Sequence, residues 1–215
     1  YHNSRSGQCA VDFLGNYSGY LQCDGYAGYH QTQATLVGCW AHARRKFVEA
    51  KTAQGKKPSG KADWALNHIQ KLDRIETQIK DKSIDERYQI RQEKSLPLLK
   101  QFEAWLIKSE QQVLPKTKLG EAITYCVNQW EKLNHYLLDG QLNIDNNRAE
   151  RAIKPFVIGS KNWLFSQTAK GAEASAILYS IIETAKANGL TPFDYLMTLL
   201  ESISQSDYDI ENLLP

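Results

Sequence analysis

The longest uniform segment of the chain, residues 62–138, follows a helical pattern and holds few strand-like runs. Its apolar residues recur at intervals of three and four, which places them on one face of a helix. A linker rich in glycine and charge precedes it at residues 54–60, and Asp139-Gly140 closes it. The segment therefore predicts an all-helical insertion of three or four helices, which the rest of the fold must accommodate.

Two short runs ahead of this insertion are typical of buried β-strands. Residues 19–23 are apolar and aromatic and end at Asp24-Gly25, a pair that favours a turn. Residues 35–39 form the second run, and the spacing becomes helical over residues 40–53. Asp24 is therefore expected at the C-terminal end of a strand.

A short helix that carries Glu150 is expected after the insertion. The Asp-Asn-Asn sequence of residues 145–147 favours the start of a helix. Pro155 is expected to end it, because proline lacks the N–H donor and crowds the preceding turn. Residues 156–165 are rich in aromatic side chains and are expected to be irregular.

Further helices are expected near both ends of the chain, within residues 4–14, 172–187 and 191–204. Together these elements predict an α/β fold, one domain interrupted by a helical insertion. The expected parts are residues 1–54 (part of the core and the start of the insertion), 55–140 (the insertion), 141–190 (the completion of the core) and 191–215 (a C-terminal helical element).

The composition of the chain limits the classes of function that it can have. Lys and Arg number 26 against 24 Asp and Glu, a net charge of +2, so any nucleic-acid contact must come from local basic clusters. No apolar run approaches the roughly 20 residues that span a bilayer, which predicts a soluble protein with no membrane partner. The cysteines form no C-x-x-C pair, and a reducing, cytoplasmic compartment is expected. They are Cys9, Cys23, Cys39 and Cys126.

Asp24 and Glu150 are the candidate catalytic residues. Two-metal phosphoryl transfer needs carboxylates that converge from separate elements to hold hard cations roughly 4 Å apart. Each acid also has a structural alternative. Asp24 could be a turn residue before glycine, and Glu150 could complete a capping box begun by Asn147 or pair with Lys154.

Four blocks of sequence stand in order along the chain: LQCDGYAGY (residues 21–29), CWAHARRKF (39–47), DNNRAERAIKP (145–155) and KNWLF (161–165), the last followed by a helix at 174–190. They resemble the insertion sequence 66 family of bacterial transposases, DDE enzymes with an RNase H-like catalytic core. The resemblance runs from about Ser4 to Leu200, interrupted only in the insertion.

The resemblance implies that Asp24 and Glu150 hold Mg²⁺ or Mn²⁺ and that the protein cuts its element's ends and joins them to target DNA. The family's first catalytic aspartate has no counterpart here and is expected upstream of Tyr1, in a longer parent protein. DNA is the implied partner, and a homo-oligomer is the expected active complex. An isolated chain of these 215 residues is expected to be inactive.

Two basic groups are candidate DNA contacts, since guanidinium and ammonium groups pair with phosphate oxygens. They are Arg44, Arg45 and Lys46 after the second strand, and Arg148, Arg151, Lys154 and Lys161 around and after Glu150. Both groups could equally be solvated helix faces.

Two further patterns also have purely structural interpretations. Cys39 and His42 have C-x-x-H spacing, but a structural zinc site needs four ligands and no second pair lies nearby. Aromatic residues could stack on unpaired bases or fill the core. They are Tyr26, Tyr29, Trp40, Trp163 and Phe165.

Two rival functions remain open. One is an RNase H-like nuclease that does not join strands, and the other is an inactive transposase remnant that binds DNA or assists assembly.

Overall fold

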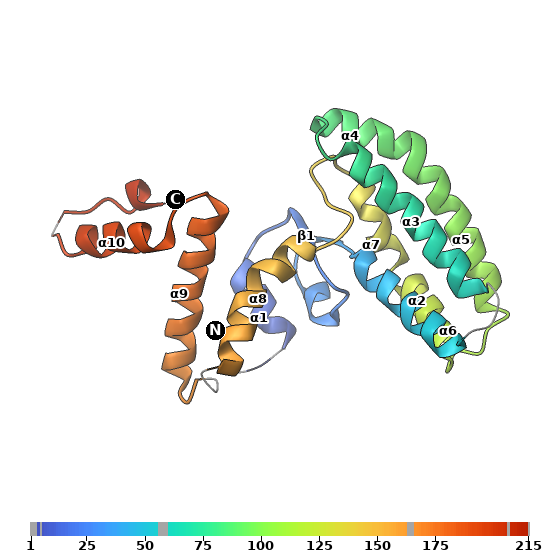
Figure 1. The fold of residues 1–215 in the computed structure, drawn as a ribbon, viewed down its shortest axis with the longest axis horizontal. Helices are drawn as coiled ribbons and strands as arrows, with labels where there is room; N and C mark the ends of the chain where they lie inside the picture. Colours follow the sequence, from blue (N-terminus) through green and yellow to red (C-terminus); the bar gives the residue numbers. More distant parts are fainter. Residues whose placement is uncertain (1–3, 5, 56–59, 163–165, 206, 215) are drawn as a thin grey trace. The chain divides into compact units, whose positions relative to one another are not determined.

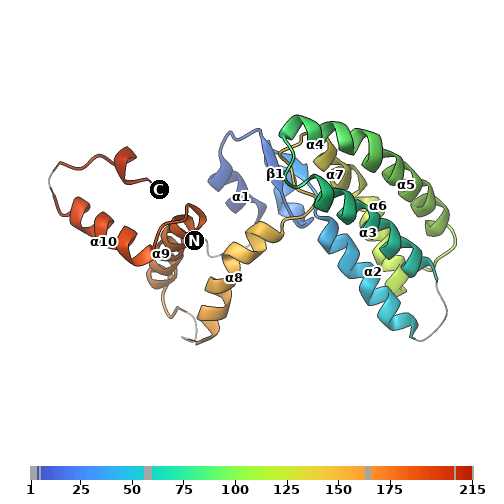
Figure 2. The same ribbon diagram turned by 45° about the horizontal axis from the view of Figure 1, so that its top comes forward.

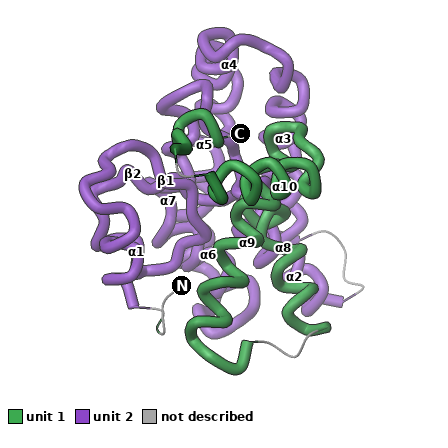
Figure 3. Tube along the Cα trace, turned by 90° about the vertical axis from the view of Figure 1, so that its left-hand side faces the viewer, with its two compact units in different colours: residues 1–4, 149–215 green, residues 5–148 purple. Residues whose placement is uncertain are grey.

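The computed structural model describes the chain except for residues 1–3, 5, 56–59, 163–165, 206 and 215. It contains two compact units, coloured in Figure 3, and each is described by itself. Arg5–Arg148 is called the core unit here, and Ala149–Pro215 belongs to the C-terminal unit. Helices predominate among the described residues, and the strands form one small sheet. The helical character is confirmed, whereas the β part of the predicted α/β fold is limited to this sheet.

The sheet joins the two predicted strands. β1 is Tyr20–Gln22 and β2 is Thr35–Val37; they run parallel, with Leu21 opposite Leu36. Both strands are confirmed, although each is shorter than its predicted run. The 3-10 helix η1, Ala27–Gln31, lies between them in sequence. Because parallel strands end at the same edge of a sheet, the residues that follow β1 and β2 lie at one edge.

Four long helices of the core unit form a bundle: α2 (Trp40–Gln54), α3 (Lys61–Ile79), α5 (Leu96–Glu110) and α6 (Lys118–Asn128). Both α2 and α5 contact α3 and α6, and Figures 1 and 2 show the four helices side by side. The other helical segments of the unit are α1 (Gly7–Leu14), α4 (Ile84–Ile90), the π-helical turn η2 (Arg91–Ser95), α7 (Trp130–Asn134) and η3 (His135–Leu137). The helical character of residues 62–138 is confirmed, and α2, which precedes them, packs into the same bundle.

An aromatic cluster at the centre of this bundle forms the core. Trp40 is buried at the first position of α2, and its ring meets the Phe102 ring edge-on at a centroid distance of 5.5 Å. Phe47 packs edge-on against the same Phe102, at 6.1 Å. The Trp40 indole N–H donates to the carbonyl of Leu133 at 2.8 Å, which satisfies the one polar atom of that side chain. The core thus joins α2 to α5 and to α7.

A buried arginine ties the insertion to the chain that follows it. Arg91 is fully buried, and its guanidinium donates to both carboxylate oxygens of Glu76, at 2.9 and 2.6 Å. It also donates to the carbonyls of Tyr136 and Asp139 at 2.9 Å and of Leu142 at 2.8 Å. These bonds compensate the buried charge and fix the path of residues 136–142 toward the helix that carries the candidate glutamate.

The C-terminal unit is helical in its described part. Its elements are α8, which begins at the end of the core unit (Asn147–Asn162), α9 (Ala169–Ala187), α10 (Pro192–Ile203) and the short η4 (Glu211–Leu213). The Thr168 hydroxyl accepts the amide of Gly171 at 3.0 Å and caps α9, and Gly189 has φ +75° just after its end. Both predicted C-terminal helices are confirmed. Among the helices described, none is long and apolar enough to cross a membrane.

The prediction that Pro155 ends the glutamate-bearing helix is wrong. Helix α8 continues through Pro155 to Asn162, so residues 156–162 are helical rather than irregular. Residues 163–165 lie outside the described part of the chain. The Phe156 ring packs edge-on against Tyr179 of α9, at a centroid distance of 5.2 Å. Pro155 thus removes one backbone hydrogen bond from α8 without ending the helix.

Candidate functional site

Asp24 follows β1, as predicted, and its side chain is exposed. The residue before it, Cys23, is buried and donates its amide to the carbonyl of Val37 at 2.9 Å, which continues the sheet by one bond. The Asp24 Oδ1 atom accepts the amide of Tyr26 at 3.0 Å, and Gly25 between them has φ +92°. Asp24 is therefore a turn residue, and the same turn orients its carboxylate at the sheet edge.

The chain that enters α8 lies at the same sheet edge. The Gln22 side-chain amide donates to the carbonyl of Asn143 at 2.6 Å, and the Trp40 amide donates to the carbonyl of Ile144 at 3.0 Å. Residues far apart in sequence thus meet where both strands end. The core unit brings the Asp24 turn and the start of the glutamate-bearing segment to one edge of its sheet.

Glu150 lies in the first turn of α8 and is half-buried. The helix start is fixed by Asp145, whose Oδ1 accepts the amide of Asn147 at 3.0 Å and whose Oδ2 accepts the Asn147 side-chain amide at 2.7 Å. Asp24 belongs to the core unit and Glu150 to the C-terminal unit. In the described ranges, no group of three His, Cys, Asp or Glu residues could hold a metal ion.

The first basic group lies on α2. Arg44 and Arg45 are exposed, whereas Lys46 is half-buried because its ammonium lies over the Tyr125 ring, 5.4 Å from the centroid. Burial raises the pKa of Asp73 on α3, and the positive charge of Arg44 opposes that rise. Lys46 thus contributes to the packing of the bundle, whereas Arg44 and Arg45 form an exposed positive surface.

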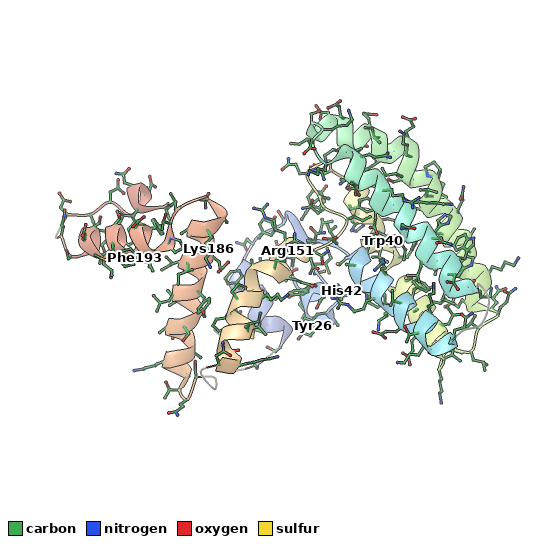
Figure 4. The ribbon with its side chains drawn as sticks, in the orientation of Figure 1. Tyr26, Trp40, His42, Arg151, Lys186 and Phe193 are labelled. Atoms are coloured by element: carbon green, nitrogen blue, oxygen red, sulfur yellow. The ribbon has the colours of Figure 1, made fainter. Side chains whose placement is uncertain are left out.

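The second basic group lies on α8. Arg148, Arg151, Lys154 and Lys161 are all exposed, and Figure 4 labels Arg151. Successive helical residues turn by about 100°, so Lys154 and Lys161 point within about 40° of the direction of Glu150. This spacing places positive side chains on the glutamate side of the helix.

The sequence did not indicate that residues of α6 and α7 contact the Asp24 turn and η1. The Tyr125 hydroxyl donates to the main-chain carbonyl of Asp24 at 3.1 Å. The Lys132 ammonium lies 2.8 Å from His30 Nε2 and donates to the side-chain carbonyl of Gln129 at 3.1 Å. These side chains lie about a hundred residues from the turn in sequence, so no local motif could have indicated them.

The cysteines pack as small apolar residues, as expected. Burial raises the pKa of the Cys23 and Cys39 thiols, so both stay protonated at neutral pH and neither supplies a thiolate nucleophile. The Cys39 sulfur accepts the amide of Asn146 at 3.4 Å. That contact gives Cys39 a structural role beside the sheet edge.

The candidate stacking aromatics differ in accessibility. Tyr26 is exposed and contacts the Tyr29 ring edge-on at 5.5 Å, whereas Trp40 fills the bundle core; Figure 4 labels Tyr26 and Trp40. Trp163 and Phe165 lie outside the described residues. Tyr26 is thus the accessible aromatic next to Asp24.

The strand-end carboxylate, the helical insertion and the glutamate-bearing helix occur in an order that matches a known class of proteins. Residues 1–174 match the family described as "Transposase IS66 family", and residues 180–215 match the "IS66 C-terminal element". The chain therefore belongs to the IS66 family of transposases, and the resemblance of its sequence blocks is confirmed.

Two similar proteins come from Sinorhizobium fredii (strain NBRC 101917 / NGR234) and are described as uncharacterised. The protein y4jD is 33% identical over 228 residues, which cover 100% of this chain and 44% of y4jD. The protein y4qI is 34% identical over 232 residues, covering 100% of this chain and 42% of y4qI. The chain thus spans less than half the length of these relatives. No solved structure matches it.

Proposed function

We propose that this chain supplies part of the catalytic domain of a DDE transposase, which cuts the ends of its element and joins them to target DNA. The carrying observation is an exposed carboxylate, Asp24, oriented at the end of a parallel strand in a member of the IS66 family. The proposed catalytic domain is an RNase H-like core, and the helices at residues 55–140 interrupt it. The four-part division at residues 54, 140 and 190 belongs to the same proposal.

Asp24 and Glu150 would hold Mg²⁺ or Mn²⁺ together with an aspartate from the rest of the whole protein. Their donor chemistry fits, because these hard cations prefer carboxylate oxygens. Bound divalent ions would activate the attacking oxygen and stabilise the leaving one. The protein's own contribution is orientation, since the Tyr26 amide holds one Asp24 oxygen in place.

The basic residues of α2 and α8 would bind DNA phosphates. Arg151, Lys154 and Lys161 extend along the helix that carries Glu150, and guanidinium and ammonium groups pair with phosphate oxygens. Arg148 belongs to the same group, and the exposed arginines of α2 offer a second surface. Their contribution would fall as salt concentration rises, because phosphate binding releases counterions. The active complex on DNA is proposed to be a homo-oligomer in the cytoplasm.

A strand-transfer assay on the whole protein tests this function. A supercoiled plasmid is incubated with labelled element ends and Mg²⁺, and the joined product is measured. Asp24→Asn and Glu150→Gln should each reduce joining on the order of 100-fold or more, because a metal ligand is lost. Asp12→Asn is the matched control, since Asp12 is an exposed acid on α1 that bonds Gln8. It should leave joining unchanged.

Three outcomes would overturn the proposal. Metal-dependent cleavage without a joined product would indicate a nuclease. DNA binding without cleavage would indicate an inactive binding or assembly module. If the Asp24→Asn variant still joins DNA, the Asp24 carboxylate is not part of the catalytic site. The 215-residue chain by itself should give no joined product, because two carboxylates leave a divalent cation largely hydrated.

A further inference from the structure

Helix α6 forms a hydrogen bond with the Asp24 turn through Tyr125. Tyr125 is half-buried, and its hydroxyl donates to the Asp24 main-chain carbonyl at 3.1 Å, across 101 residues of sequence. Gln129 lies one helical turn further on, and a Cβ added at Gly25 would come within 3.3 Å of its side-chain carbon. The Tyr125 hydroxyl therefore bonds the turn at Asp24, and the Gln129 side chain occupies the space where a Gly25 side chain would lie.

The other contacts of the Asp24 turn do not fix the Asp24–Gly25 peptide, which the Tyr125 bond holds. The Cys23 amide anchors the chain before Asp24 to β2, and the Tyr26 amide bonds the Asp24 carboxylate from after it. Between these anchors, Gly25 has φ +92°, a region that glycine enters without strain. The orientation of the Asp24–Gly25 peptide is therefore not fixed by local sequence alone, and the bond from Tyr125 holds its oxygen.

Tyr125 is itself held as a hydrogen-bond donor. The Lys46 ammonium lies over its ring at 5.4 Å from the centroid. A tyrosine hydroxyl carries its proton at neutral pH, so it can donate to the Asp24 carbonyl. The bundle thus presents a fixed hydroxyl to the sheet edge.

We infer that Tyr125 is a positioning residue of the proposed metal site, which fixes the Asp24 peptide and thereby the direction of the Asp24 carboxylate. The inference rests on the proposed function and extends it, because it gives the helical insertion a part in metal binding. When the direction of a carboxylate is not held, its affinity for the cation falls first. The reaction at saturating cation concentration is affected less.

The test is Tyr125→Phe in the whole protein, with strand joining measured against Mg²⁺ concentration. Phenylalanine keeps the ring under Lys46 and removes only the hydroxyl. The Mg²⁺ concentration for half-maximal joining should rise about threefold to tenfold, as expected for one lost neutral hydrogen bond. Joining at saturating Mg²⁺ should return close to the unmodified level.

Two further variants sharpen this test. Gln129→Ala, which removes the side chain against Gly25, should shift the Mg²⁺ dependence in the same direction. Tyr88→Phe is the matched control, because Tyr88 is an exposed tyrosine of α4, and it should shift nothing. An unfolding curve for each variant shows whether it folds. If Tyr125→Phe does not fold, the Mg²⁺ dependence of Gln129→Ala is the deciding measurement.

The outcomes separate the two proposals. An unchanged Mg²⁺ dependence, or an equal fall in joining at every Mg²⁺ concentration, would overturn the role of Tyr125 while Asp24→Asn still abolishes joining. If Asp24→Asn leaves joining intact, the proposed function itself fails, and the role of Tyr125 fails with it.

Discussion

At the scale of single residues, Arg91 shows how one buried charge can organise several segments. Its guanidinium offers five N–H donors in a fixed plane, and here they reach one carboxylate and three main-chain carbonyls. It also lies over the Tyr136 ring, 5.2 Å from the centroid. A lysine could not reproduce this planar set of bonds, because its three donors diverge from one atom.

Arg91→Met should destabilise the protein by about 3–5 kcal/mol, because it removes the close buried partner of the Glu76 carboxylate and of the Tyr136 and Asp139 carbonyls. Urea unfolding of the 215-residue chain measures the change. The control is Arg74→Met, an exposed arginine of α3, which should change stability by less than about 0.5 kcal/mol. Adding Glu76→Met to Arg91→Met should restore part of the loss. An Arg91→Met variant as stable as the control would contradict the prediction.

At the scale of elements, periodicity predicted where helices and strands occur. The short apolar and aromatic run before Asp24 predicted β1, and the three-to-four spacing predicted α2 and the helices of residues 62–138. The end of α9 was also predicted, since the helix stops at Ala187 and Asn188 and Gly189 follow it. Pro155 did not end α8, because a proline inside a helix removes one hydrogen bond while the helix can continue on both sides of it.

The contacts that build the candidate site could not be predicted in the same way. The bonds of Tyr125 to Asp24 and of Arg91 to Leu142 join residues 101 and 51 positions apart. Local spacing carries no record of such pairs, because they depend on which helices become neighbours in the bundle. The sequence therefore indicated the candidate carboxylates but not the residues that hold them.

Pro155→Ala should stabilise α8. Alanine restores an N–H that can donate to the carbonyl of Arg151 and removes the ring that crowds the preceding turn. The gain should be about 1–3 kcal/mol, and it should appear as higher helical content by circular dichroism and as delayed unfolding of the C-terminal unit. Val157→Ala, an exposed position of the same helix, is the control and should add little. A loss of stability in Pro155→Ala would show that the ring contributes more to packing than its backbone cost.

At the scale of the whole molecule, apolar burial is concentrated in one unit. The main hydrophobic cluster runs from Val37 to Ile144, entirely within Arg5–Arg148. In the C-terminal unit, the fully buried apolar residue among those described is Ala185. Burial of apolar surface is the dominant favourable contribution to folding, so the core unit should carry most of the chain's stability.

A polypeptide of residues 5–148 should therefore fold without the C-terminal unit. Its tryptophan fluorescence, from residues 40, 64, 105 and 130, should show one cooperative urea transition with the midpoint seen for the whole chain. The matched control ends at residue 138 and lacks the Asp139 and Leu142 carbonyls that Arg91 bonds, and the Ile144 carbonyl that accepts the Trp40 amide. That shorter polypeptide should unfold at a clearly lower urea concentration, because the buried guanidinium loses acceptors that water cannot replace. Equal midpoints for the two polypeptides would mean that residues 139–148 pack on the bundle but do not stabilise it. A broad, non-cooperative transition in residues 5–148 would show instead that the C-terminal unit is needed for the core to form.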